Sequence, residues 1–127
     1  MTLCKNAFKD KFSIDERQRQ TKVVLEKHYP YKVPVIIQKH HKEKSICTIE
    51  KNKFLVPMDM NYSQLMLVLR KRMLDKISPT IAIFLCTEDG KMLSNTELIS
   101  SVYDKHHDKN DNFLYLFYLG ENTFGSS

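Results

Sequence analysis

Hydrophobic and polar residues change their spacing several times along this chain, and the first segments predict helices. Residues 5–11 suit a short basic helix of one or two turns. Phe8 and Phe12 lie four positions apart, the spacing that places two side chains on the same face of a helix, so we expect both to face inward.

A second helix has clear ends but few apolar residues. Ser13 and Glu16 have the spacing of a capping box, in which each side chain satisfies the other's backbone N–H, so the helix begins there. It runs to about His28, because Tyr29-Pro30 disfavours further helix. The inward candidates are Ile14, Val23, Val24 and Leu25. We therefore expect this helix to lie outside a core that later segments build.

The pattern then changes to that of a β-hairpin. Residues 33–37 are largely β-branched and predict a strand, in which Pro34 is compatible only with a sheet edge or with the strand's first residues. A polar turn over residues 40–45 separates it from a second strand, predicted over residues 47–56 and ending at Pro57. The two strands would pair antiparallel.

A main helix follows the hairpin. Asn61 and Gln64 again have capping-box spacing. The residues after Asn61 carry an apolar stripe at helical spacing: Tyr62, Leu65, Met66, Leu69 and Met73. This stripe predicts a helix that packs one face against the sheet.

Three more elements complete the pattern. The continuous apolar run 81–86 predicts a buried strand. Ser94 and Glu97 repeat the capping-box spacing before a short helix with four apolar residues: Leu98, Ile99, Val102 and Tyr103. Residues 113–119 are all apolar or aromatic and predict the central strand.

The order of elements predicts the fold class. Two helices are followed by β-β-α-β-α-β, the order of a ubiquitin-like β-grasp, an α+β fold with a four-stranded mixed sheet around one main helix. We expect an N-terminal helical extension over residues 1–28, the β-grasp domain over 29–119 and a flexible C-terminal tail over 120–127.

Composition narrows the class of protein. A chain of 127 residues with 42% hydrophobic and 28% charged residues is one globular domain, without room for a separate catalytic domain. No secretory signal or run of about 18 apolar residues is present, so a cytoplasmic protein is expected. The net charge of +5 favours acidic partners, which include acidic peptides, anionic lipid surfaces and nucleic acid.

Cysteine and histidine residues do not predict a site. Three cysteines at wide spacing are expected to be free thiols in a reducing compartment, and Cys86, in an apolar run, should be inert. A metal site could be built from Cys47 and the two histidine pairs, His40-His41 and His106-His107. These residues lack the spacing of metal ligands, so we expect the histidines to be exposed and to bind no metal. The sequence contains no phosphate-binding loop and no paired carboxylates. We therefore expect that the protein needs no cofactor, and that it is a substrate of enzymes and not an enzyme itself.

Five short segments, in order, carry a family resemblance. They are KVPVI at 32–36, KFLVP at 53–57, LRKR at 69–72, FLY at 113–115 and ENTFG at 121–125. Together they resemble the ubiquitin-like autophagy modifiers, the family of GABA-receptor-associated protein and the microtubule-associated light chain. The resemblance implies a β-grasp with two extra N-terminal helices, as the element order also predicts.

The resemblance also implies a conjugation cycle. A processing cysteine protease would cut between Gly125 and Ser126, with Phe124 as its bulky handle. Activating and conjugating enzymes would then join Gly125 to phosphatidylethanolamine, and the protein would occupy the autophagosome membrane through this covalent lipid. Glycine suits each step because it has no side chain to crowd a narrow cleft or a thioester. The two acyl chains of the lipid would anchor the protein, because each buried CH₂ group stabilises membrane binding by about 0.8 kcal/mol.

Cargo receptors with a short aromatic/aliphatic motif would bind the lipidated form. The peptide would add to strand 33–37 if that strand is an open edge. The family pattern places an aromatic pocket at Leu25, Pro34, Ile36, Lys53, Leu55 and Phe113, and an aliphatic pocket at Phe54, Val56, Pro57, Met60, Leu65 and Val68. Acidic flanks of the motif would meet Lys32, Lys51, Lys53 and Arg70.

The strand that contributes to both pockets alternates its side chains. Lys53 and Leu55 would face one pocket, and Phe54 and Val56 would face the other. We expect Phe54 to be partly exposed. Of the pocket residues Ile36, Leu65, Val68 and Phe113, we expect at least two to serve mainly in the core. Thr21 stands where the family often has an acidic residue, and Met60 gives a softer pocket than the usual aliphatic residue.

Two other functions remain as alternatives. A nucleic-acid module would explain the positive charge, but the aromatics lie in apolar runs and no recognition signature is present, so we expect no specific nucleic acid. A peptide-binding adaptor in membrane traffic that is never lipidated would keep the pockets without using Gly125. The basic N-terminal helices could add contacts to microtubules or anionic surfaces.

Overall fold

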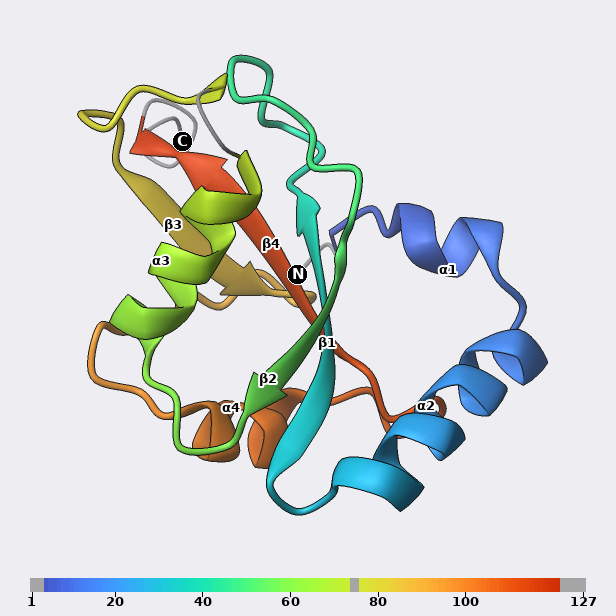
Figure 1. Ribbon diagram of the computed structural model, residues 1–127. Helices are drawn as coiled ribbons and strands as arrows, with labels where there is room; N and C mark the ends of the chain where they lie inside the picture. The colour runs from blue at the N-terminus through green and yellow to red at the C-terminus, as the bar shows by residue number, and fades with distance from the viewer. Residues whose placement is uncertain (1–3, 74–75, 122–127) are drawn as a thin grey trace.

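The computed structural model describes residues 4–73 and 76–121, and its centre is a four-stranded mixed sheet (Figure 1). The strands are β1 (Lys32–Lys39), β2 (Lys53–Pro57), β3 (Ile83–Thr87) and β4 (Leu114–Gly120). Their spatial order is β2-β1-β4-β3, with β1 and β4 parallel and the other neighbours antiparallel. The hairpin and the central position of the last strand are therefore confirmed.

Helices cover both faces of this sheet. They are α1 (Ala7–Lys11), α2 (Ile14–His28), α3 (Tyr62–Met73) and α4 (Ile99–His106). α3 and α4 lie on one side, and the two N-terminal helices lie on the other (Figure 1). This arrangement is the α+β ubiquitin-like β-grasp with two extra N-terminal helices, as the sequence predicts.

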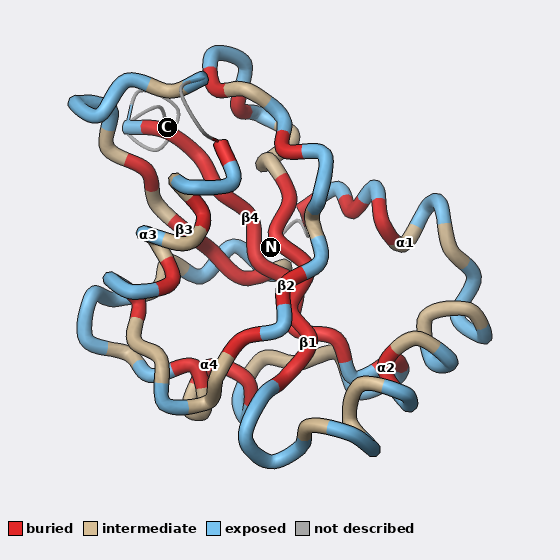
Figure 2. Tube along the Cα trace, viewed as in Figure 1, coloured by how far each residue is buried: buried red, intermediate tan, exposed pale blue. Residues whose placement is uncertain are grey.

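The sheet separates two apolar layers, because successive side chains of a strand point to opposite faces. Leu116 and Tyr118 of β4 belong to the larger layer, under α3 and α4, whereas Tyr115 and Phe117 belong to the smaller layer with Phe8 of α1. Every residue of β4 is buried (Figure 2). Burial on both faces explains why the strand is a continuous apolar run and does not alternate.

Two of the three expected helix caps form. Asn61 Oδ1 accepts the Gln64 N–H at 2.9 Å while Gln64 Oε1 accepts the Asn61 N–H at 2.9 Å, a complete capping box. Ser13 Oγ accepts the Glu16 N–H at 3.2 Å.

The capping box expected before α4 is wrong. The N-cap of α4 is Leu98, which makes no side-chain cap bond. The first helical N–H groups instead reach the backbone before α3: Ile99 N–H donates to the Met60 carbonyl at 2.9 Å and Ser100 N–H to the Met58 carbonyl at 3.0 Å. A neighbouring loop thus satisfies the donors that a cap would otherwise take.

The second strand is shorter than the sequence predicts. Residues 47–52 are not part of the ladder, and backbone groups of two of them bond to a tyrosine of β4 instead. The Tyr118 hydroxyl donates to the Cys47 carbonyl at 2.6 Å and accepts the Ile49 N–H at 3.2 Å. Pairing with β1 therefore begins only at Lys53, opposite Ile36.

The predicted open edge at residues 33–37 is also wrong. β1 lies between β2 and β4, and the open edge on this side of the sheet is β2. Pro34 is tolerated inside the sheet for a local reason. Ile37 N–H points toward β2, where it bonds to the Asn52 carbonyl, so by alternation the nitrogen of Pro34 faces β4. The ladder with β4 begins only at Val35, so no hydrogen bond is lost.

Helix α2 is fastened by polar groups. Ile14 and Val23, expected inward, keep 37% and 66% of their surface exposed, and the buried residue of α2 is Thr21. Thr21 Oγ1 donates to the Asp111 carbonyl at 2.6 Å, and Arg17 forms an ion pair with the buried Asp111 carboxylate. Hydrogen bonds and an ion pair thus attach this helix to the protein. Its exposed apolar side chains are not needed for this attachment.

Helix α1 faces the body of the protein as expected. Phe8 is buried and Phe12 half-buried, with their ring centroids 4.8 Å apart. Lys9 pairs with Glu88 at 3.0 Å and with Asp108 at 2.6 Å. One basic residue of this helix is therefore used to hold the helix in place and does not project toward a partner.

Candidate functional site

A pocket of about 540 Å³ lies between α2 and β2. Its residues come from α2, from β1 and β2 and from the residue directly before β4. They are Gln20, Val23, Val24, Lys27, His28, Pro34, Lys53, Phe54, Leu55 and Phe113. We refer to this hollow as the α2–β2 pocket. It contains four of the six residues expected for the aromatic pocket, namely Pro34, Lys53, Leu55 and Phe113.

The α2 wall of this pocket was not identified from the sequence, although the signal was present. Residues 20, 23, 24, 27 and 28 follow one helical face at spacings of three and four. That spacing explains why Val23 remains exposed: it lines the pocket and does not enter the core. Leu25, the residue expected here, points elsewhere and lines a separate hollow of about 440 Å³ beside Tyr29 and Tyr103.

Strand β2 presents alternate side chains to the two sides of the sheet, as predicted. Lys53 and Leu55 are exposed, whereas Phe54 and Val56 are buried. The expected partial exposure of Phe54 is wrong, because its ring keeps 4% exposure and packs in the larger apolar layer. The Arg72 guanidinium covers it, 3.9 Å from the ring centroid.

Several residues expected in the pockets belong to the core. Ile36 is fully buried, and Leu65 and Val56 keep 1% and 2% exposure. Phe113 is also buried at 3%, although it reaches the floor of the α2–β2 pocket. The other three residues expected in the aliphatic pocket are partly exposed: Pro57, Met60 and Val68. A ligand on the α3 side of β2 would meet these three residues.

The outer edge of β2 offers backbone groups to an added strand. Because the Asn52 carbonyl points inward to Ile37, alternation turns the N–H and C=O groups of Lys53 and Leu55 outward. Arg72 Nη1 donates to the Lys53 carbonyl at 3.1 Å and to the Lys51 carbonyl at 2.6 Å, so one end of this edge is occupied. The edge at Leu55 adjoins the pocket.

Positive charge surrounds this edge. Lys32, Lys51 and Lys53 are exposed, and Lys27 lines the pocket. Arg70 is half-buried and donates to the Ile81 carbonyl, so part of its guanidinium serves the fold. The surface beside the pocket is thus suited to an acidic segment.

The expected processing residues Phe124, Gly125 and Ser126 lie outside the described residues. The structure does show the base of this segment. Gly120, placed in the tail by the sequence, is the last residue of β4 and is buried. Its N–H donates to Glu43 Oε1 at 2.6 Å, and a Cβ at this position would lie 2.8 Å from Ile46 Cδ1.

Glu43 is a buried carboxylate that the sequence did not single out. It lies in the turn after β1 with 2% exposure. Its Oε2 accepts the Ser45 N–H at 2.9 Å and the Ile46 N–H at 3.1 Å, while Oε1 holds Gly120. This side chain therefore joins the turn after β1 to the end of β4.

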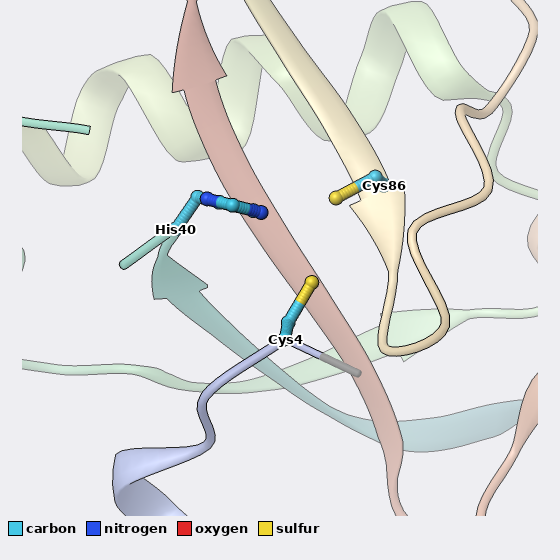
Figure 3. Close-up of side chains that lie close together, drawn as sticks. All are labelled: Cys4, His40 and Cys86. Carbon is cyan, nitrogen blue, oxygen red and sulfur yellow. The ribbon is translucent and has the colours of Figure 1, made fainter. Parts of the chain in front are cut away.

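The histidines are not exposed as expected. His40, His41, His106 and His107 are all half-buried. His40 does not meet Cys47 but lies beside Cys4 and Cys86, with the ligand atoms of the three side chains within 4.8 Å of one another (Figure 3). The Cys4 thiol donates to the Thr87 carbonyl at 3.7 Å. The nearby Cys4 thiol and burial raise the pKa of Cys86, and the nearby Cys86 thiol lowers the pKa of Cys4. Burial lowers the pKa of His40.

The fold and the α2–β2 pocket define a ubiquitin-like protein in which the second N-terminal helix forms one wall of a pocket beside an open strand edge. A sequence model of the family "Autophagy protein Atg8 ubiquitin like" matches residues 16–125. The chain belongs to this Atg8 family of ubiquitin-like autophagy proteins.

Individual relatives agree with this assignment. Autophagy-related protein 8 of Schizosaccharomyces pombe is 41% identical over 122 residues, covering 96% of each chain. The protein of the same name from Gibberella zeae is 40% identical over 123 residues, covering 97% of this chain and 99% of its own. The crystal structure of Trypanosoma brucei ATG8 is similar with a TM-score of 0.81 and 31% identity, covering 92% of this chain and 96% of the other.

Proposed function

We propose that this chain is cleaved after Gly125 and conjugated through that residue to phosphatidylethanolamine on autophagosomal membranes, where it recruits cargo receptors. One observation carries the conjugation step: the family match ends at residue 125 and leaves Ser126 and Ser127 beyond it. A glycine at the end of the matched region has the chemistry that cleavage and thioester transfer require. No helix among the described residues is long and apolar enough to cross a bilayer.

The chain acts in this proposal as a substrate. The processing protease, the activating enzyme and the conjugating enzyme perform the chemistry on Gly125. The protein itself supplies a buried strand end, Gly120, five residues before Gly125 in the sequence. In the cytoplasm the chain is unanchored, and after conjugation the two acyl chains hold it on the membrane.

Gly125→Ala is expected to abolish membrane association. In cells with active autophagy, wild type should lose Ser126 and Ser127 by intact mass and float with membranes, while the variant should remain in the soluble fraction. A chain ending at Gly125 is the matched control, because it needs no protease and should still reach membranes. Membrane association of Gly125→Ala at the wild-type level, or wild type found only at full-length mass, would contradict the proposal.

Receptor recruitment uses the α2–β2 pocket and the β2 edge. An extended peptide would pair with the outward N–H and C=O groups of Leu55, as an added strand. An aromatic side chain would enter the pocket between Val23 and Pro34, and an aliphatic side chain would meet Pro57 and Met60 on the other side of the strand. Acidic flanking residues would meet the exposed lysines. This placement replaces augmentation on β1, which has no free edge.

Leu55→Ala is expected to weaken binding of such a peptide by about tenfold, since it removes apolar contact equivalent to roughly 1.5 kcal/mol. Leu55 is 42% exposed, so the fold should be unaffected. Leu67→Ala is the matched control, because Leu67 is 61% exposed on α3 and does not line the pocket. The affinity of each variant is measured by isothermal titration calorimetry with an acidic peptide that carries an aromatic and an aliphatic anchor. Equal affinity of wild type and Leu55→Ala would exclude this face.

The alternative function, a peptide-binding adaptor that is never lipidated, can be distinguished from the proposed function by experiment. Such a protein would show the Leu55→Ala loss of peptide affinity and no dependence of membrane association on Gly125. The two measurements together therefore distinguish the two functions.

A further inference from the structure

A second cluster of chemically active side chains lies on the α1 side of the sheet, apart from the α2–β2 pocket. Cys4 precedes α1, His40 directly follows β1, and Cys86 is in β3. Their sulfur and nitrogen atoms lie within 4.8 Å of one another. Figure 3 shows the His40 ring reaching across β4 toward the two sulfurs. Segments distant in sequence thus bring two thiols and one imidazole together.

The three backbones are held in place by the fold. Cys4 N–H donates to the Glu88 carbonyl at 2.8 Å, and His40 N–H donates to the Tyr118 carbonyl at 2.9 Å. Cys86 is paired with Phe117 in the β3–β4 ladder. The donor atoms are therefore positioned before any ligand arrives, which reduces the entropy lost on binding.

We infer that Cys4, His40 and Cys86 form a binding site for a Zn²⁺ ion. Two thiolates and one imidazole are a donor set that Zn²⁺ prefers, and a Cys₂His site takes water as its fourth ligand. Zn–S bonds of about 2.3 Å and Zn–N bonds of about 2.0 Å place ligand atoms of one tetrahedral ion roughly 3.5–3.8 Å apart. A contraction of the cluster by about 1 Å would accommodate the ion.

The open side of the site is next to His40. Cys4 and Cys86 are buried at 6% and 2% exposure, whereas His40 is half-buried and adjoins an exposed turn. The fourth, water ligand therefore enters from the side of the His40 ring. The two Zn–S bonds form with loss of both thiol protons to solvent.

The His40 ring has one nitrogen available for the ion. Its Nδ1 accepts the Lys42 N–H at 3.1 Å, an exposed contact, which leaves Nε2 for the sulfur side. When Nε2 binds Zn²⁺, the ring proton moves to Nδ1, and the Lys42 N–H turns to water. The exchange at His40 gives up one solvent-exposed hydrogen bond. Deprotonation of Cys4 also ends the bond from its Sγ to the Thr87 carbonyl at 3.7 Å, but that carbonyl keeps the Gly90 N–H at 2.9 Å.

The bound ion would connect the N-terminal segment to the sheet. Cys4 lies two residues before the α1 N-cap Asn6, and Phe8 packs in the same apolar layer as Cys86. Zn²⁺ would thus stabilise the docking of α1 onto β1 and β3. It would not contact the α2–β2 pocket, so the site is independent of the proposed function.

Metal binding by the full-length chain, kept reduced with a phosphine, tests this inference. Zn²⁺ is expected to bind with one-to-one stoichiometry in competition with a chromophoric chelator and to raise Tm. Co²⁺ should give the thiolate-to-metal charge-transfer absorption of a tetrahedral site. Cys4→Ser and His40→Gln should each weaken Zn²⁺ binding by more than about 100-fold, beyond the loss usual for a residue that only supports a ligand.

Two substitutions outside the cluster serve as matched controls. Cys47→Ser removes the third, half-exposed thiol, and His107→Gln removes an imidazole that stacks on Tyr103 and is not part of the cluster. Both should bind Zn²⁺ as wild type does. Circular dichroism of Cys4→Ser verifies that the fold persists, since Cys4 precedes the first helix. Absence of the Co²⁺ thiolate absorption, or a loss of Zn²⁺ affinity in Cys47→Ser equal to that in Cys4→Ser, would overturn the inference.

Discussion

Replacing Asp111 by Ala is expected to lower the free energy of unfolding by about 3–5 kcal/mol, the range for breaking a buried ion pair from one side. Asp111 is fully buried. Its carboxylate accepts the Tyr115 hydroxyl at 2.6 Å and the Phe113 N–H at 2.8 Å, in addition to the ion pair with Arg17. Removing it would leave a cation and two neutral donors without their acceptor.

The same substitution should open the peptide site. Arg17 and Thr21 attach α2 to Asp111, and the wall of the α2–β2 pocket is the adjoining face of that helix, because Val24 and His28 follow Arg17 and Thr21 by seven positions. Loss of the carboxylate removes the Arg17 contact, so α2 should separate from the sheet more readily than β4 unfolds. We therefore expect weakened binding of the aromatic/aliphatic peptide as well as reduced stability.

Urea unfolding and peptide titration measure the two effects. Asp59→Ala is the matched control, because Asp59 is an exposed aspartate and should change stability by less than about 0.5 kcal/mol. Burial and the hydrogen bond to Asp111 raise the pKa of Tyr115. Its titration should consequently shift down in the variant, toward the ordinary value for tyrosine. A variant as stable as Asp59→Ala would disprove the role assigned to this carboxylate.

Glu43→Ala is the second substitution with a large expected effect, a loss of about 3 kcal/mol or more. Each buried N–H left without an acceptor costs about 1–3 kcal/mol, and Glu43 serves Ile46 and Gly120 as well as Ser45. The end of β4 should loosen most, because the Gly120 N–H has its acceptor in this side chain. The strand end that precedes Gly125 by five residues would then be less well ordered.

Hydrogen exchange at the Gly120 amide measures this loosening directly, and urea unfolding measures the loss of stability. Glu43→Gln retains a carbonyl oxygen and should lose less than Glu43→Ala. Glu50→Ala is the surface control, because Glu50 is exposed. Slow exchange of Gly120 in Glu43→Ala, equal to wild type, would show that the carboxylate does not hold the strand end.

Both carboxylates illustrate what local pattern cannot reveal. Asp111 and Glu43 stand in polar stretches between predicted elements, where acidic residues are usually solvated. Their burial results from contacts with residues 94 and 77 positions away in the sequence, Arg17 and Gly120. No spacing rule relates such distant positions, so the polar contacts that support the pocket wall and the strand end emerge only from the fold.

Sequence by itself determined the order of elements, the α+β class, the Ser13 cap of α2, the capping box of α3, and the alternation along β2, because each depends on residues a few positions apart. It also supported family membership, since short segments that match a family in the same order can be recognised without knowledge of their contacts. Tertiary structure alone decided that β1 lies inside the sheet and β2 at its edge. It also decided that Phe54 is covered by Arg72, that Val23 and not Leu25 lines the pocket, and that Cys4, His40 and Cys86 meet. The physical reason is the same in each case: strand order and side-chain burial depend on contacts between distant segments, which the spacing of neighbouring residues does not encode.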